Sequence, residues 1–186
     1  MNIHAHGYWS HEGAEKRHLC SPRLAAFLVR YLDRSAPTYD LGCGLGTYLL
    51  ALRNEGFERL RGFEGDPPTT SHFQNIEKHD LTLPLNVEPP GNVICLEVAE
   101  HIPAAFAHVL LESIDRACAD KLVFSWAVRE QPGEGHCNSH DNFEVLPLLM
   151  GRGFSLDMQA TRQARDLAGA DLWWFKQTIM AMRRGS

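Results

Sequence analysis

Two glutamates and a histidine lie within five residues of one another, at Glu97, Glu100 and His101. If the turn that follows Glu97 is helical, the three side chains fall on one side of it, because positions i, i+3 and i+4 share a helical face. Two carboxylates and an imidazole suit a divalent cation such as Mg²⁺, Mn²⁺, Fe²⁺ or Zn²⁺. The segment therefore predicts a cation site with these three residues as ligands.

A fourth ligand would come from the segment 125–142, which contains two further histidines. Both His136 and His140 are expected at the same end of the predicted sheet as Glu97. His140 precedes Asp141 and has a second interpretation, as part of the cap of a helix that begins nearby. A structural zinc centre is not expected, because Cys137 and His136 are adjacent and cannot easily chelate one ion together.

Asp40 begins a second candidate site, in a run with glycine at every other position: Gly42, Gly44 and Gly46. Glycines let the backbone turn sharply and let a ligand approach without meeting a Cβ. The pattern differs from the dinucleotide fingerprint G-x-G-x-x-G, whose third glycine would fall at Thr47. A turn that serves only packing is the alternative, but its place between a predicted strand and a predicted helix favours a turn that cradles a ligand.

Two acidic residues further along the chain belong with this turn. Glu64 ends a second predicted strand, where a carboxylate can accept hydrogen bonds from two ribose hydroxyls. Asp80 ends a third and can accept a hydrogen bond from an adenine amino group. Taken alone, Glu64 could also be an acidic residue of a solvent-exposed loop. The prediction of a nucleoside site therefore depends on the glycine turn, Glu64 and Asp80 taken together.

With these motifs the chain resembles the class I S-adenosylmethionine-dependent methyltransferases over about residues 37–154. The resemblance implies S-adenosylmethionine as the cofactor, bound across the carboxyl ends of the strands with the glycine turn facing its methionine moiety. It also implies an α/β fold with a Rossmann-like, seven-stranded, mostly parallel sheet, helices on both faces and an antiparallel C-terminal edge strand. The residues matched to the cofactor motifs are Asp40, Gly42, Gly44, Gly46, Glu64, Gly65, Asp80 and Leu81.

The resemblance gives the Glu97 segment two alternative roles. In many metal-free methyltransferases the corresponding Glu touches the cofactor amino group, and the His caps the next helix or acts as a base. The segment also looks like the Glu-x-x-Glu-His motif of ubiquinone-pathway O-methyltransferases and small-RNA 2′-O-methyltransferases, where a bound metal lowers the pKa of the acceptor hydroxyl. Glu97 is therefore both a candidate cofactor contact and a candidate metal ligand.

The loop at His136 resembles a subgroup of bacterial and viral methyltransferase-like proteins, in which a Ser-Trp-Ala strand end precedes a Gly-His-x-Asn loop. This likeness favours His136 over His140 as the fourth ligand. It makes His101 and His136 the candidate catalytic residues, as bases or as metal ligands.

The elements that must position these residues alternate along the chain. Strands are expected at 38–41, 59–64, 75–80, 92–97 and 121–127, and helices from Pro22, at 47–55, at 103–119 and at 142–150. This alternation predicts a mainly parallel sheet covered on both faces. The segments 154–160 and 172–182 are expected as a closing antiparallel pair. Alternation places Trp173 and Phe175 on one face of the last strand and Trp174 on the other. Core packing is the expected role of these aromatic residues, and substrate stacking is the alternative.

One domain is expected over residues 1–186, with 1–35 as an N-terminal helical and lid segment and 36–186 as the cofactor-binding core. The resemblance implies that the lid segment folds over the cofactor and contributes to the acceptor pocket. Tyr8 and Trp9 can supply flat apolar surface there, and Arg17 or His18 can hold an acidic group. A surface segment docked by its aromatic residues is the alternative.

Composition limits the function further. The chain has 186 residues, 44% of them hydrophobic, and a formal net charge of −5, which argues against binding to nucleic acid. No apolar run approaches the roughly 20 residues needed to span a bilayer, and no secretory signal is expected. Five widely spaced cysteines, an odd number, are expected to stay reduced in a cytoplasmic protein.

The preferred function is methyl transfer from S-adenosylmethionine to a small polar acceptor, through an oxygen or nitrogen nucleophile and with a divalent metal as a candidate second cofactor. Methylation of the 3′-terminal ribose 2′-hydroxyl of RNA is the alternative reaction, disfavoured by the acidic balance. A non-catalytic, cofactor-binding regulatory protein is the third interpretation. No sequence feature indicates an oligomeric state.

Overall fold

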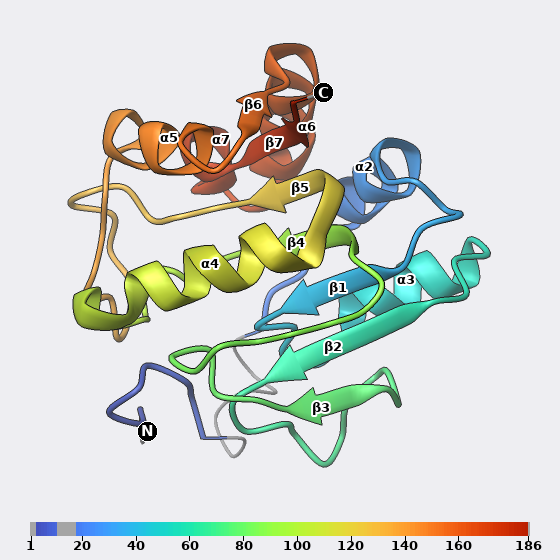
Figure 1. Cartoon of the computed structure of the whole chain (residues 1–186), viewed down its shortest axis with the longest axis horizontal. Helices are drawn as coiled ribbons and strands as arrows, with labels where there is room; N and C mark the ends of the chain where they lie inside the picture. The colour runs from blue at the N-terminus through green and yellow to red at the C-terminus, as the bar shows by residue number, and fades with distance from the viewer. Residues whose placement is uncertain (1–2, 11–17, 186) are drawn as a thin grey trace.

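A seven-stranded sheet in the order β3-β2-β1-β4-β5-β7-β6 forms the centre of the molecule (Figure 1). The computed structural model describes residues 3–10 and 18–185. Its strands are β1 (Thr38–Leu41), β2 (Leu60–Glu64), β3 (Ile76–Lys78), β4 (Gly91–Cys95), β5 (Cys118–Phe124), β6 (Phe154–Leu156) and β7 (Met180–Arg184). Its helices are α2 (Pro22–Tyr31), α3 (Thr47–Asn54), η1 (Ala104–Phe106), α4 (Ala107–Ala117), α5 (Asn142–Met150), α6 (Met158–Asp171) and α7 (Phe175–Thr178).

Pairing within the sheet is parallel from β3 across to β5. β7 runs antiparallel to both of its neighbours, β5 and β6. The predicted Rossmann-like α/β fold, with a mostly parallel sheet and an antiparallel C-terminal strand, is confirmed. The last strand lies one position inside the edge, which β6 forms.

Alternate residues of the strands pack into two separate hydrophobic cores, one on each face of the sheet. On β5, for example, Leu122 and Phe124 join the core that α4 and α5 cover, whereas Val123 joins the core beneath α2, α3 and α6. Figure 1 shows α4 in front of the sheet and α3 behind it. Helices therefore cover both faces, as a parallel sheet requires.

The C-terminal part differs from the sequence prediction. Residues 157–160 and 172–178 are not strand; β6 ends at Leu156, and most of the following segment forms α6 and α7. Asp157 caps α6 by accepting a hydrogen bond from the Ala160 N–H at 2.9 Å. Ala160, Ala164 and Ala168 then form a buried stripe that packs in the same core as α2. The helix forms because these small residues recur at the spacing of one helical face.

The Trp-Trp-Phe segment is consequently not part of the closing strand. Trp173 is 56% exposed, whereas Phe175 begins α7 and is 2% exposed. The predicted sharing of one face and the predicted core position of Trp173 are therefore both wrong. Trp174 lies partly buried against the core under α6. Short helical turns here bring Trp174 and Phe175 to the edge of the large cavity described below.

The carboxyl ends of β1, β4 and β5 lie at one edge of the sheet. Asp40 pairs with Ile94 of β4, and Cys95 at the end of β4 pairs with Phe124 of β5. The glycine turn and the segments that carry Glu97 and His136 therefore leave the sheet side by side. Within the described residues, no helix has the length and apolar character needed to cross a membrane.

Candidate active site

A cavity of 360 Å³ opens at the carboxyl ends of these strands. Its polar lining comes from the glycine turn, from the turn after β4 and from the loop after β5, and includes Asp40, Glu97, His101, Gln131, Glu134 and His136. A smaller cavity of 80 Å³ adjoins it and is lined by Glu64, Gly65 and Leu81. Gly42 and Glu97 line both, so the two cavities form one continuous site.

The glycine turn has the backbone that its sequence predicts. Gly42, Gly44 and Gly46 have φ of 76°, 53° and 72°, in the left-handed region that residues with a Cβ rarely adopt. A Cβ on Gly44 would collide with the ring of His18, and one on Gly42 would collide with Val98. Both the backbone conformation and the space around the turn therefore require glycine.

Asp40 lies beneath this turn and is only 3% exposed. Its Oδ2 has no hydrogen-bond partner among the described residues. Burial, with a smaller contribution from the charge of Glu64, raises the pKa of Asp40 to about 8. The carboxyl group is thus mostly protonated at neutral pH until a cation reaches it.

Glu64 is held against the glycine turn. One carboxylate oxygen accepts the Gly44 N–H at 2.9 Å and the other accepts the Gly65 N–H at 2.8 Å. The side chain of Tyr8 packs directly on Gly65, leaving no space for a Cβ there. Glu64 and Gly65 therefore lie between the glycine turn and the N-terminal segment, and their contact with a ribose stays a prediction.

Asp80 is engaged by two protein partners. Its Oδ1 accepts hydrogen bonds from the Thr82 N–H at 2.9 Å and the Thr82 hydroxyl at 2.7 Å, and its Oδ2 lies 2.5 Å from Nδ1 of His6. Burial alone would raise the pKa of Asp80, but the hydrogen bonds from His6 and Thr82 outweigh it and lower the pKa. The next residue, Leu81, packs in the core beside the smaller cavity.

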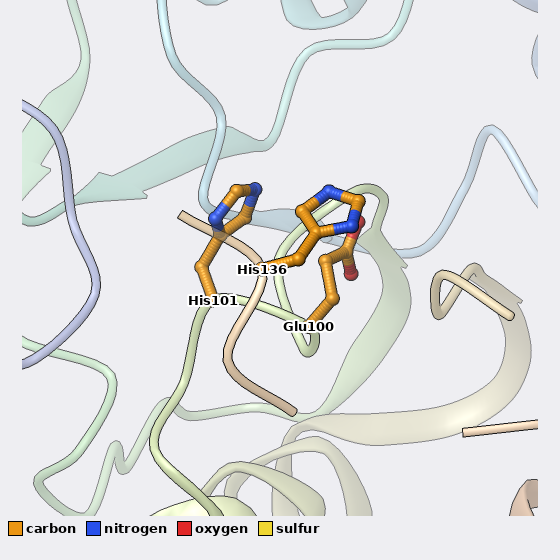
Figure 2. Close-up of side chains that lie close together, drawn as sticks. All are labelled: Glu100, His101 and His136. Carbon is orange, nitrogen blue, oxygen red and sulfur yellow. The ribbon is translucent and has the colours of Figure 1, made fainter. Parts of the chain in front are cut away.

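Glu100, His101 and His136 form the cluster with metal-binding chemistry. Each offers one ligand atom, and these three atoms lie within 4.8 Å of one another. Figure 2 shows the three side chains grouped together, two from the turn after β4 and one from the loop after β5. No side chain within the described residues forms a hydrogen bond with either carboxylate oxygen of Glu100, with Nδ1 of His101 or with Nδ1 of His136.

The cluster is buried, and burial determines its protonation. Burial, followed by the nearby charge of Glu97, raises the pKa of the Glu100 carboxyl well above its usual value. Burial, together with His136, lowers the pKa of His101 to about 4, and burial also lowers the pKa of His136. Both imidazoles are therefore neutral at pH 7, the state in which a ring nitrogen can bind a metal or accept a proton.

Glu97 lies outside that cluster. Its Oε1 accepts a hydrogen bond from the Ser125 hydroxyl at 2.8 Å, and burial raises its pKa to about 7. The backbone of Glu97 is left-handed, with φ of 55°, which is unfavourable for a residue with a Cβ. No sequence motif singles out Ser125 for a functional role; this residue directly follows β5 and lies at the same edge of the sheet as Glu97.

His140 points elsewhere. Its Nε2 lies 3.0 Å from Oδ1 of Asn138, and its ring packs edge-on against Trp126. Its Nδ1 is 3.6 Å from Glu144, which also accepts the Asp141 N–H at 3.0 Å and so helps to cap α5. His136, and not His140, is the histidine of this loop that reaches Glu100 and His101.

The N-terminal segment contacts both halves of the site. Trp9 packs edge-on against His101, with 5.7 Å between ring centroids, and His18 lies over the glycine turn. Both residues line both cavities, and Tyr8 lines the smaller one. Arg17, the other candidate of this segment, lies outside the described residues.

Several solved structures resemble the fold of this chain. One is a magnesium protoporphyrin IX methyltransferase from Synechocystis PCC 6803 with bound S-adenosylmethionine, at 19% identity, covering 87% of this chain and 78% of that chain, with a TM-score of 0.59. Another is a 1,6-didemethyltoxoflavin-N1-methyltransferase from Burkholderia thailandensis, at 14% identity, covering 94% and 82%, with a TM-score of 0.63. The fold is that of the class I S-adenosylmethionine-dependent methyltransferases.

The same fold also occurs in a protein named for another reaction. The cyclase SpnF is 14% identical, covers 99% of this chain and 87% of its own, and has a TM-score of 0.56. No family model and no curated protein sequence matches the chain. At these identities the likeness establishes the fold, and the activity must be argued from the site.

Proposed function

We propose that this protein transfers a methyl group from S-adenosylmethionine to an oxygen or nitrogen nucleophile of a small polar acceptor. The observation that carries the proposal is the buried carboxyl of Asp40, which lines the large cavity beneath the left-handed glycine turn. The cofactor brings a sulfonium and an ammonium group, and a buried carboxylate is the counter-charge that such cations need in a site of low dielectric constant. Methionine in the large cavity and adenosine towards Glu64 is the orientation that fits this chemistry.

Glu100, His101 and His136 are the residues that would hold a divalent cation. The fit rests on the three mutually close ligand atoms and on polar atoms that no other described side chain satisfies. One carboxylate and two imidazoles suit Mn²⁺, Fe²⁺ or Zn²⁺ better than Mg²⁺, which prefers oxygen ligands. A bound cation would lower the pKa of an acceptor hydroxyl.

The protein residues then have separable roles in the transfer. The acceptor lone pair displaces the sulfur in line, and the acceptor gives up a proton. Asp40 and Glu64 fix the cofactor, while the walls of the cavity exclude water from the methyl group. His101, neutral at pH 7 because of its lowered pKa, can take the proton if it is not occupied by a metal.

Calorimetric titration with S-adenosylmethionine tests the cofactor site. We expect binding with a Kd of about micromolar order, lost in Asp40→Ala and in Gly44→Val. Gly56 supplies the matched control, because it has φ of 86° but only Arg34 within 4 Å of its added Cβ. Gly56→Val should lose stability and retain the cofactor. Unchanged affinity in both Asp40→Ala and Gly44→Val would overturn the proposal.

Metal content and methyl transfer are tested separately. We expect wild-type protein to retain a divalent ion that His101→Ala loses and that His108→Ala, altered at an exposed position of α4, keeps. Incubation with small hydroxyl and amine compounds should yield S-adenosylhomocysteine, and exhaustive chelation should stop the reaction. Activity that survives chelation would reduce His101 to a base. Turnover with short RNA alone would favour the RNA alternative.

A further inference from the structure

Two segments that are distant in sequence carry the three residues of the cation cluster. Glu100 and His101 lie in the turn after β4, and His136 lies in the loop after β5. Backbone hydrogen bonds join these segments at one point. The Glu100 carbonyl accepts the Cys137 N–H at 2.9 Å and the Asn138 N–H at 3.0 Å.

The side chain of Asn138 extends this connection on both sides. Its Nδ2 donates to the Ala99 carbonyl at 3.5 Å, and its Oδ1 lies 3.0 Å from Nε2 of His140. Its own carbonyl accepts the indole N–H of Trp126 at 2.5 Å. With 6% exposure, Asn138 is a buried polar residue whose hydrogen bonds run to the turn after β4 and to the end of β5.

We propose that Asn138 is the positioning residue of the cation site, holding His136 in register with Glu100 and His101. The inference rests on the proposed function, because it concerns the cation that those three residues would bind. A metal site needs ligand distances within about 0.2 Å of their preferred values, and loops do not hold such distances unaided. Asn138 lies two residues beyond His136. Its backbone N–H donates to the Glu100 carbonyl and its side-chain Nδ2 donates to the Ala99 carbonyl.

Cobalt is the probe, because the visible absorption of bound Co²⁺ reports the number and geometry of its ligands. Wild-type protein should bind Co²⁺ with a resolved spectrum, and His136→Ala should lose it. We expect Asn138→Ala to weaken Co²⁺ binding by about 10- to 100-fold and to change the spectrum. His140→Ala leaves Asn138 in place and removes only the partner of its Oδ1, so it should weaken binding by a few-fold.

Asn92 provides the matched control. It is 1% exposed and donates through Nδ2 to the Asp33 carbonyl and the Thr38 hydroxyl, at the opposite end of the sheet from the cluster. Asn92→Ala should lower the melting temperature without altering Co²⁺ affinity or spectrum. Loss of Co²⁺ binding in both asparagine variants would indicate general loosening of the fold and overturn the assignment.

The remaining outcomes separate this inference from the proposed function. Unchanged Co²⁺ affinity and spectrum in folded Asn138→Ala would overturn the role of Asn138. If that variant does not fold, unchanged Co²⁺ affinity and spectrum in His140→Ala would overturn the same inference. Wild-type protein that binds S-adenosylmethionine but no Co²⁺ would overturn the role of Asn138 and leave the cofactor proposal intact. If Co²⁺ binding depends on Asn138 but the protein does not bind S-adenosylmethionine, the cofactor proposal is overturned and the role of Asn138 stands.

Discussion

The hydroxyl of Ser125 holds Glu97 at two atoms: it accepts the Glu97 N–H at 2.7 Å and donates to Oε1 at 2.8 Å. A single side chain at the end of β5 thus fixes both the backbone and the carboxyl of a residue at the end of β4. The segments that follow β4 and β5 are therefore joined to each other where they leave the sheet.

Ser125→Ala should therefore weaken S-adenosylmethionine binding by about tenfold, because it leaves a buried N–H and a carboxyl without their partner at a cost of about 1–3 kcal/mol. Calorimetry measures the affinity and urea denaturation the stability. Ser113→Ala is the control, because Ser113 is equally buried but does not line the cavity. Its hydroxyl accepts a hydrogen bond of 3.0 Å from the Leu85 N–H. Equal loss of affinity in both variants would contradict a local role for Ser125.

Glu97 offers a test of backbone strain. Glu97→Gly and Glu97→Ala both remove the carboxyl, but only the first relieves the left-handed backbone at φ 55°. We expect the glycine variant to be the more stable of the two by about 1–2 kcal/mol in urea denaturation, and both to bind the cofactor weakly. Glu130 provides the control, because it is exposed and also has a left-handed backbone, with φ of 67°. The difference in stability between Glu130→Gly and Glu130→Ala measures the backbone strain at a position outside the cavity. An alanine variant as stable as the glycine variant would show that the turn relaxes.

Asp40 links stability and cofactor binding to pH. Its pKa of about 8 in the folded protein lies above the unfolded value of 3.8, so the folded state binds more protons between these pH values. The contribution of protonated Asp40 to the free energy of unfolding is fully present below about pH 4. Between about pH 4 and pH 8, each pH unit lowers the free energy of unfolding by up to about 1.4 kcal/mol. Asp40→Asn should therefore stabilise the cofactor-free protein at pH 7 and flatten this dependence.

The same residue should release a proton when the cationic cofactor binds. We expect the affinity for S-adenosylmethionine to rise between pH 6 and pH 8, by up to about tenfold per unit, and the binding enthalpy to vary with the ionisation enthalpy of the buffer. Asp40→Asn removes both effects. Proton-neutral binding by wild-type protein would mean that the cofactor does not reach this carboxyl.

Nδ1 of His6 lies 2.5 Å from Oδ2 of Asp80, the residue that we predict accepts a hydrogen bond from the adenine amino group. We expect an adenine amino group bound at this oxygen to displace His6, so His6→Ala should tighten S-adenosylmethionine binding by about fivefold, the equivalent of about 1 kcal/mol. His108→Ala, at an exposed position of α4, is the comparison. Weaker binding in His6→Ala would instead make His6 part of the wall of the cofactor site.

The parallel part of the fold was predictable because each of its signals is local. The glycine turn, the fully buried strand β4 and the buried second half of β5 are short runs whose residue types indicate their structure. Helix α6 was missed because its buried stripe consists of alanine, which contributes little to a hydrophobic pattern. Its local signals were Asp157 as the cap and alanine at every fourth position.

The site was predictable to the extent that strand ends converge. The grouping of Glu100, His101 and His136 follows from adjacent parallel strands, which end at the same edge of the sheet. Contacts such as those of His6 with Asp80 and Ser125 with Glu97 join residues 74 and 28 positions apart. Such pairings depend on the folded path of the loops, and no local pattern encodes them.

The place of β7 has a consequence for synthesis of the chain. Its residues are made after β5 and β6, yet it lies between them. Until residue 184 leaves the ribosome, β5 has one unpaired edge and β6 has no partner strand in the sheet. Unpaired strand edges invite association between chains. Slow translation or stalling within residues 157–179 should therefore favour aggregation, and chaperones that shield strand edges should improve the yield of folded protein.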